Sequence, residues 1–261
     1  MWTLPARWFA HHGHSVLAVD QPGHMRSKGP VCEDIPAVAA WLLDLLKAVG
    51  AREVTLVGHS MGSLIALEAA AQAAGPRPGP DTGVQGAAPA IKRLVMVGTA
   101  YPMAVSNTLL EAAEQRPAQG IDMVNAFSIS SIASKPGYPG PGSWLHGGNR
   151  ALMHRVLASN QAVNLFSHDF ALCNQYRGAE AAMARLSAST TMESNAHSSG
   201  TVQTHLVLGE RDQMTPPRAA TALAQGLKAS VHTLPVGHGL MHEDPEGFLD
   251  ILRRITAHRP G

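Results

Sequence analysis

The stretch Glu53-Val54-Thr55-Leu56-Val57-Gly58-His59-Ser60-Met61-Gly62-Ser63 joins two different patterns. Its apolar and β-branched first half predicts a buried strand, and the Ala/Leu-rich run at 64–71 predicts a helix. Between them stands Gly58-x-Ser60-x-Gly62, the pattern of a nucleophile elbow, which holds a serine hydroxyl where a base can reach it. We expect glycine at 58 and 62 because a Cβ atom there would clash in the sharp turn.

The five-residue pattern is weak on its own. At this glycine content it arises by accident in roughly one chain in five to ten. The strand before it and the helix after it make it a strong indication of a catalytic serine.

Composition limits the class of protein. The chain has 261 residues, of which 45% are hydrophobic and 15% charged, so it forms a substantial globular core rather than a fibre or a disordered chain. A formal charge of +1 without a Lys/Arg block predicts no nucleic-acid partner and favours a small-molecule substrate. No run approaches the roughly 18 to 20 apolar residues of a membrane span, and the start lacks a signal-peptide pattern. We therefore expect a cytoplasmic protein, and the oligomeric state is left open.

Strands and helices alternate along most of the chain. Asp34 is placed to cap a helix over 35–49. This alternation is typical of a doubly wound, mostly parallel sheet. Besides the elbow strand, the predicted strands are Ser15–Val19, Ile91–Val97, Val202–Leu208 and Ser230–Leu234.

The alternation stops between residues 101 and 200, where amphipathic helical stretches surround a Gly/Pro loop at 135–142. We expect residues 1–100 and 201–261 to form the core, and residues 101–200 to form a helical cap over the mouth of the sheet. Phe127 and Phe166 are predicted to line a substrate pocket there. For any one such residue, packing within the cap is the favoured alternative, by roughly two to one.

Three residue types follow three strands in the order Ser60, Asp212, His238. This is the chain order of the serine hydrolase triad on a doubly wound sheet. Glu210 competes with Asp212 for the position of the acid. The other histidines lack the carboxylate or cysteine spacing of a metal site, so no metal is predicted.

The chain resembles the α/β-hydrolase family in four motifs, and most closely its monoglyceride-lipase, esterase and cofactor-free haloperoxidase branches. The resemblance implies Ser60 as nucleophile, His238 as base, Asp212 as its orienting acid and the Met61 backbone N–H as an oxyanion donor. It also implies an ester or acyl substrate and no cofactor, with acyl transfer and perhydrolysis as alternative activities. The motifs are Asp20-Gln21-Pro22-Gly23-His24-Met25-Arg26-Ser27, Gly58-His59-Ser60-Met61-Gly62, Gly209-Glu210-Arg211-Asp212 with Pro216, and Gly237-His238 with Glu243 and Pro245.

The sequence departs from the family pattern in two places. Met25 stands where the family usually has glycine, and the family's N-terminal strands and His-Gly oxyanion loop have no counterpart. We therefore expect that Met1 is not the natural start. We also expect either an open slot beside Glu53–Val57 or a displaced Ser15–Val19 strand pressed against it. The missing loop leaves open a second function, a ligand-binding protein of this fold that is catalytically impaired.

Overall fold

A computed structural model describes residues 2–75, 88–130, 144–192 and 201–257. Within these residues, four parallel strands form one sheet in the order β1-β2-β3-β4. Because all four strands run the same way, their carboxyl ends meet at one edge of the sheet. The strands are β1 (Glu53–His59), β2 (Ala90–Val97), β3 (Gln203–Gly209) and β4 (Ser230–Leu234).

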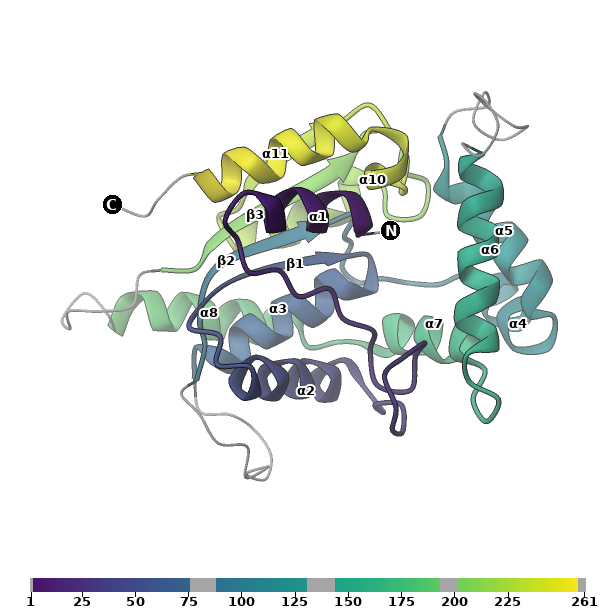
Figure 1. Ribbon diagram of the computed structural model, residues 1–261, viewed down its shortest axis with the longest axis horizontal. Coiled ribbons are helices and arrows are strands. Elements are labelled where there is room, and N and C mark those ends of the chain that lie inside the picture. Colours follow the sequence, from purple (N-terminus) through teal and green to yellow (C-terminus); the bar gives the residue numbers. More distant parts are fainter. Residues whose placement is uncertain (1, 76–87, 131–143, 193–200, 258–261) are drawn as a thin grey trace.

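Helices cover both faces of the sheet, as Figure 1 shows. The alternation of side chains along β2 explains the two layers, since Leu94 and Met96 face one set of helices whereas Val95 and Val97 face the other. The first layer contains α2 (Ile35–Ala48), α3 (Met61–Ala73), α8 (Ala179–Met192), the 3₁₀ turn η3 (Pro217–Ala220) and α9 (Thr221–Gly226). The second contains α1 (Thr3–His11), α10 (Leu240–Glu243) and α11 (Pro245–Ala257).

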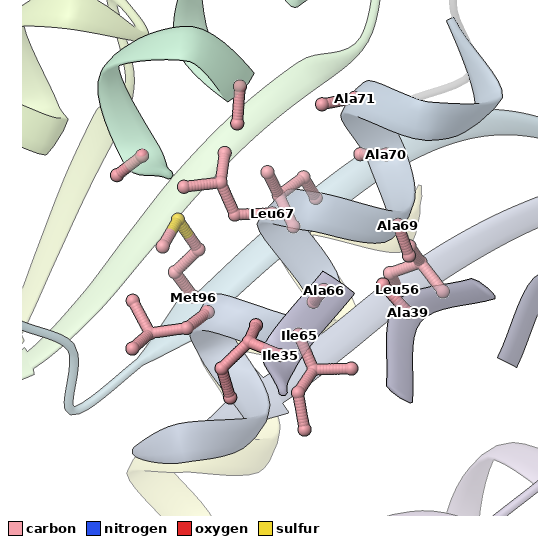
Figure 2. Packing of buried hydrophobic residues seen from close by; sticks show 14 of the residues in the cluster. Ile35, Ala39, Leu56, Ile65, Ala66, Leu67, Ala69, Ala70, Ala71 and Met96 are labelled. Carbon is pink, nitrogen blue, oxygen red and sulfur yellow. The ribbon is translucent and has the colours of Figure 1, made fainter. Parts of the chain in front are cut away.

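Helix α3 runs through the centre of the first layer. Its alanines allow close packing, and Figure 2 shows Ala66, Ala69 and Leu67 among side chains from α2 and the sheet. Glu68 on α3 is only 2% exposed. It accepts hydrogen bonds from the Tyr176 hydroxyl at 2.8 Å and from Arg185 on α8 at 2.9 Å, so this buried charge is paired. Packing and polar contacts therefore both hold α3, the helix that follows the elbow, in place.

Several predicted elements are confirmed. The helix at 35–48 begins as expected, with the Asp34 carboxylate accepting the Ala37 N–H at 2.7 Å. The strands at 91–97, 202–208 and 230–234 agree with β2, β3 and β4 to within one residue. The predicted Gly/Pro loop at 135–142 lies outside the described residues.

The predicted strand at 15–19 is wrong. Residues 14–20 form no strand and are exposed, with Leu17 51% accessible. A cavity lined by Val16 and Val19 on one side and by Leu56 on the other separates this segment from β1. The apolar run pairs with no strand among the described residues. Without a ladder of hydrogen bonds it does not form a strand itself. Of the two arrangements expected beside β1, the structure has the open slot.

Four helices between β2 and β3 stand beyond the carboxyl ends of the strands (Figure 1). Helix α8 follows them but packs with α3 in the layer beneath the sheet, so it does not stand with these four. None of the described helices is long and apolar enough to cross a membrane. The four helices are α4 (Asn107–Gln115), α5 (Pro117–Ser128), α6 (Leu145–Ala158) and α7 (Leu165–Gln175).

Candidate active site

Ser60 is the single residue between the end of β1 and the start of α3. Its backbone has φ 53° and ψ −122°, in the positive-φ range that a residue with a side chain rarely adopts. Its N–H donates to the Val97 carbonyl of β2 at 2.9 Å, and its own carbonyl accepts the Ser63 N–H at 2.8 Å and the Ser63 hydroxyl at 2.6 Å. The neighbouring strand and the first turn of α3 thus hold the strained turn.

The structure accounts differently for the two elbow glycines, Gly58 and Gly62. A Cβ atom at Gly58 would lie 2.0 Å from the Gly62 carbonyl oxygen, so the turn requires glycine at position 58. A Cβ atom at Gly62 would meet nothing within 4 Å outside its own helix, and the backbone there has no positive φ. The expected clash at Gly62 is therefore wrong, since the space that its Cβ atom would occupy is open.

Asp212 and His238 meet at the same edge of the sheet. Asp212 follows β3 and His238 follows β4, and the Asp212 Oδ2 lies 2.8 Å from the Nδ1 of the imidazole. The carboxylate also accepts the Met214 N–H, the Thr215 N–H and the Thr215 hydroxyl, each at 2.8 Å. Asp212 is 4% exposed and His238 7% exposed. The pair is therefore buried and the carboxylate is held from several sides.

The carboxylate of Asp212 stays ionised. Burial raises the pKa of Asp212, but the hydrogen bonds from His238 and Thr215 lower it by more, so the net pKa is below the ordinary value. Glu210, the competing acid, is exposed and accepts a hydrogen bond from the Thr233 hydroxyl at 3.0 Å. The structure thus brings Asp212, and not Glu210, to the imidazole.

His238 has one ring nitrogen without a partner among the described residues. Its Nδ1 contacts Asp212 and the Thr215 hydroxyl, which leaves Nε2 uncommitted. Ser60 and His238 line the same cavity, but no hydrogen bond joins the Ser60 hydroxyl to the ring. Such bonds are often long without ligand and tighten when ligand binds. The acid and the base are in contact, and the serine is on the same cavity wall.

Met61 is the first residue of α3. The first N–H groups of a helix have no acceptor within the helix, and they favour negative charge. No described residue accepts a hydrogen bond from the Met61 N–H, and Met61 lines the cavity beside Ser60. This N–H is thus placed to donate to an oxygen bound there.

Contacts from several elements hold the loop that carries His238. Glu243 accepts the Gly237 N–H at 2.9 Å and the Ser130 hydroxyl at 2.6 Å. The Gly239 N–H donates to the Ser128 carbonyl at 3.0 Å. On the opposite side, the His59 Nε2 lies 2.8 Å from the His238 carbonyl oxygen. Sequence reasoning assigned no role to His59 or Glu243, although both stand inside motifs that carry the family resemblance.

A cavity of about 1240 Å³ opens beside these residues. One part is the slot beside β1, and the other lies by Ser60 and His238 against α6 and α7. Phe166 lines this cavity together with Met153 and Phe170, and its role in binding a substrate stays a prediction. Phe127 does not line the cavity: it is 48% exposed and lies away from the buried face of α5, so the prediction for this residue is wrong.

A second carboxylate–histidine cluster joins α7 to the N-terminal part of the chain. Asp169, which also lines the cavity, lies 3.2 Å from the His24 Nε2 and 3.1 Å from the His168 Nδ1. The His24 Nδ1 lies 3.0 Å from the Pro22 carbonyl oxygen, and the His168 Nε2 lies 3.0 Å from that of Cys32. Burial lowers the pKa of His24, but Asp169 raises it by more. Residues 24 and 169 are too far apart in the sequence for any local pattern to link them.

The comparisons with known proteins agree on one architecture. The model of the alpha/beta hydrolase family matches residues 1–251. An esterase from Exiguobacterium antarcticum is similar over 98% of this chain and 87% of its own, with 17% identity and a TM-score of 0.74. A bromoperoxidase from Bacillus anthracis is similar over the same shares, with 14% identity and a TM-score of 0.73.

A third solved structure is described as Est816, an N-acyl homoserine lactone degrading enzyme. It is 19% identical, with a TM-score of 0.69 over 97% of this chain and 86% of its own. A comparison with curated protein sequences gave no match. At these identities the solved structures show a shared fold, and the family model is what relates the chain by sequence.

Proposed function

The chain belongs to the alpha/beta hydrolase family, and on that premise we propose that it is a serine hydrolase acting on an ester or related acyl bond. Ser60 attacks the carbonyl carbon while His238 takes the hydroxyl proton and passes it to the leaving group. Water then attacks the acyl-enzyme, giving its proton to His238, which returns one to Ser60 as the acid leaves. Asp212 holds the imidazole so that Nδ1 carries its proton. These steps use no cofactor.

The observation that carries this proposal is the state of the His238 ring. Its Nδ1 lies 2.8 Å from an ionised, buried carboxylate, and its Nε2 is free on a cavity that Ser60 also lines. A general base needs this arrangement, with one nitrogen oriented and the other open to the proton it takes. The Met61 N–H supports the same chemistry as a donor to the oxyanion of the tetrahedral intermediate.

The substrate we propose is small to medium and largely apolar. Met153, Phe166 and Phe170 supply apolar surface to the cavity from α6 and α7. We propose α4 to α7 as the cap that roofs the site and opens for the substrate. Solved relatives described as esterases and as a lactone-degrading enzyme support acyl chemistry on this fold. Acyl transfer or perhydrolysis would use the same residues with another acceptor in place of water.

One observation favours a second function. The Ser60 hydroxyl makes no hydrogen bond to His238, which also fits a ligand-binding protein that has lost turnover. The two functions differ in whether the serine is nucleophilic. A fluorophosphonate reacts with an activated serine and leaves a bare binding site unlabelled.

The test compares the purified chain with two variants, Ser60→Ala and the matched control Ser187→Ala, whose serine is exposed on α8. We expect the native chain and the control to hydrolyse p-nitrophenyl esters of increasing acyl length and to be labelled at residue 60, as mapped by mass spectrometry. Ser60→Ala should lose both properties, with roughly 10³-fold or greater loss of kcat. Normal turnover in Ser60→Ala would end the proposal, and binding without labelling would favour the second function.

A further inference from the structure

His59 lies between the elbow and the base. It is the last residue of β1 and directly precedes Ser60 in the chain. Its Nε2 lies 2.8 Å from the His238 carbonyl oxygen, and the two rings have centroids 4.6 Å apart. A carbonyl oxygen can only accept, so the Nε2 carries the proton and donates.

The His59 ring is neutral across the working range of pH. Burial, followed by the nearby His238 ring, lowers the pKa of His59 to about 3. A ring with this pKa and with its Nε2 bonded to a carbonyl is a poor general base. A role in proton transfer is therefore excluded on physical grounds, and a role through its hydrogen bond remains.

We propose that His59 is a positioning residue for His238, an inference that rests on the proposed serine hydrolase function. The other anchors of the base loop include Glu243, the Ser128 carbonyl and the Arg211 N–H, which tie it to α10, to the last residue of α5 and to the segment after β3. Among the described residues, the bond from His59 is the only hydrogen bond that joins residues 58–63 to residues 235–239. It links the backbone of the base directly to the residue before the nucleophile.

This link has a consequence for the reaction. The imidazole must keep its place while the Ser60 hydroxyl loses its proton and the bond between the two side chains changes. A contact that avoids the reacting atoms can hold the base loop at constant distance through all steps. Displacing a catalytic group by about 1 Å can cost about 10²-fold in rate. The loss should fall on kcat, because His59 donates to the protein and not to the substrate.

The experiment uses three variants of the full chain. His59→Leu removes the donor, and His59→Gln keeps an N–H the same number of bonds from the backbone. His12→Leu is the control, because His12 is an exposed histidine at the end of α1. We measure kcat and KM with a p-nitrophenyl ester, the rate of fluorophosphonate labelling, and the thermal unfolding midpoint, from pH 5 to pH 9.

We expect His59→Leu to lose about 10- to 100-fold in kcat and in labelling rate with KM nearly unchanged. His59→Gln should recover most of the loss, and His12→Leu should match the native chain. The ratio of native to His59→Leu activity should not change with pH, because His59 does not titrate in this range.

Two outcomes would overturn the inference alone: full kcat in His59→Leu, or equal losses in the Leu and Gln variants that follow a lowered unfolding midpoint. A native chain without turnover and without labelling would overturn the proposed function and this role with it. The two failures are thus told apart by the native chain itself.

Discussion

The chain contains two carboxylate–histidine clusters that use the same groups differently. At the carboxyl ends of β3 and β4, Asp212 is held by two backbone N–H groups and the Thr215 hydroxyl, and it orients one histidine. On α7, Asp169 contacts one histidine through each of its oxygens. The first cluster leaves the His238 Nε2 open, whereas the second commits all four ring nitrogens to oxygen atoms.

The two clusters differ in how many N–H donors each imidazole needs for its hydrogen bonds. A neutral imidazole has one N–H, so a ring between two acceptors makes both bonds only when it carries two protons. His24 and His168 each lie between a carboxylate and a backbone carbonyl. For His24, whose pKa is raised, the full set of bonds requires a charged ring. His238 faces only one acceptor carboxylate, so its Nε2 is left for the proton transfer that we propose. A histidine that takes and returns a proton needs a free nitrogen, and one that joins segments does not.

An Asp→Asn substitution in each cluster should give the largest difference between them in kcat. Asp212→Asn is expected to lower kcat by roughly 10³- to 10⁴-fold, because the amide no longer favours the tautomer with a proton on Nδ1. Asp169→Asn should leave kcat within about threefold while lowering the unfolding midpoint, since it weakens a tie between segments. Steady-state kinetics and thermal unfolding of both variants measure this. Equal losses of kcat would mean that Asp169 also serves the reaction.

Removing one donor from the first cluster should have a smaller effect. Thr215→Val deletes the hydroxyl that donates to Asp212 at 2.8 Å and leaves the two backbone donors and His238 in place. We expect a loss of about three- to tenfold in kcat, since one hydrogen bond to a charged group is only partly transmitted to the imidazole. Thr221→Val, at the exposed first residue of α9, is the matched control. A loss as large as that of Asp212→Asn would show that the hydroxyl, rather than the backbone, holds the carboxylate.

The cluster around Asp169 should make the stability of the fold depend on pH. Asp169 raises the pKa of His24 above 6.5 despite burial, so the stability from this group is full below pH 6.5 and is lost as pH rises through the folded-state pKa. Although burial raises the pKa of Asp169, its hydrogen bonds to His168 and His24 bring it below 3.8. The contribution of Asp169 is therefore present above pH 3.8 and is lost as pH falls through the folded-state pKa.

The two shifts together place the strongest effect between about pH 4 and pH 6.5. The unfolding midpoint of the native chain should exceed that of His24→Gln by a few degrees near pH 5.5, and by less at pH 8.5. Besides Asp169, the groups that raise the pKa of His24 are the Pro22 carbonyl and the Asp20 carboxylate. A difference that grows with pH would contradict the assignment of charges in the cluster.

The sequence predicted the first cluster because each member follows its own strand. Apolar runs locate the strands. Parallel strands bring Ser60, Asp212 and His238 to one edge of the sheet, independently of how the helices between β2 and β3 are arranged. Their catalytic roles stay a proposal. The second cluster could not be predicted, since His24 and His168 owe their contacts to the docking of α7, which no local pattern encodes.

The errors also have physical reasons. The run at 15–19 is apolar enough for a strand, but strand structure depends on pairing, and this run pairs with no strand among the described residues. Phe127 was predicted from residue type alone, whereas the buried face of α5 is set by Ile121, Val124 and Asn125. Gly62 fitted the motif, yet its surroundings leave room for a Cβ atom.

The free edge of β1 also predicts where protection against deuterium exchange begins to fail. Among the described residues, β1 has a neighbour only in β2, whereas β2 and β3 are paired on both sides. Amides on the unpaired side of β1 have no acceptor strand, so they should exchange through small local openings. The amides of β2 and β3 should exchange only when the protein unfolds globally. The order of exchange would then divide the sheet into cooperative units, with β1 opening before β2 and β3.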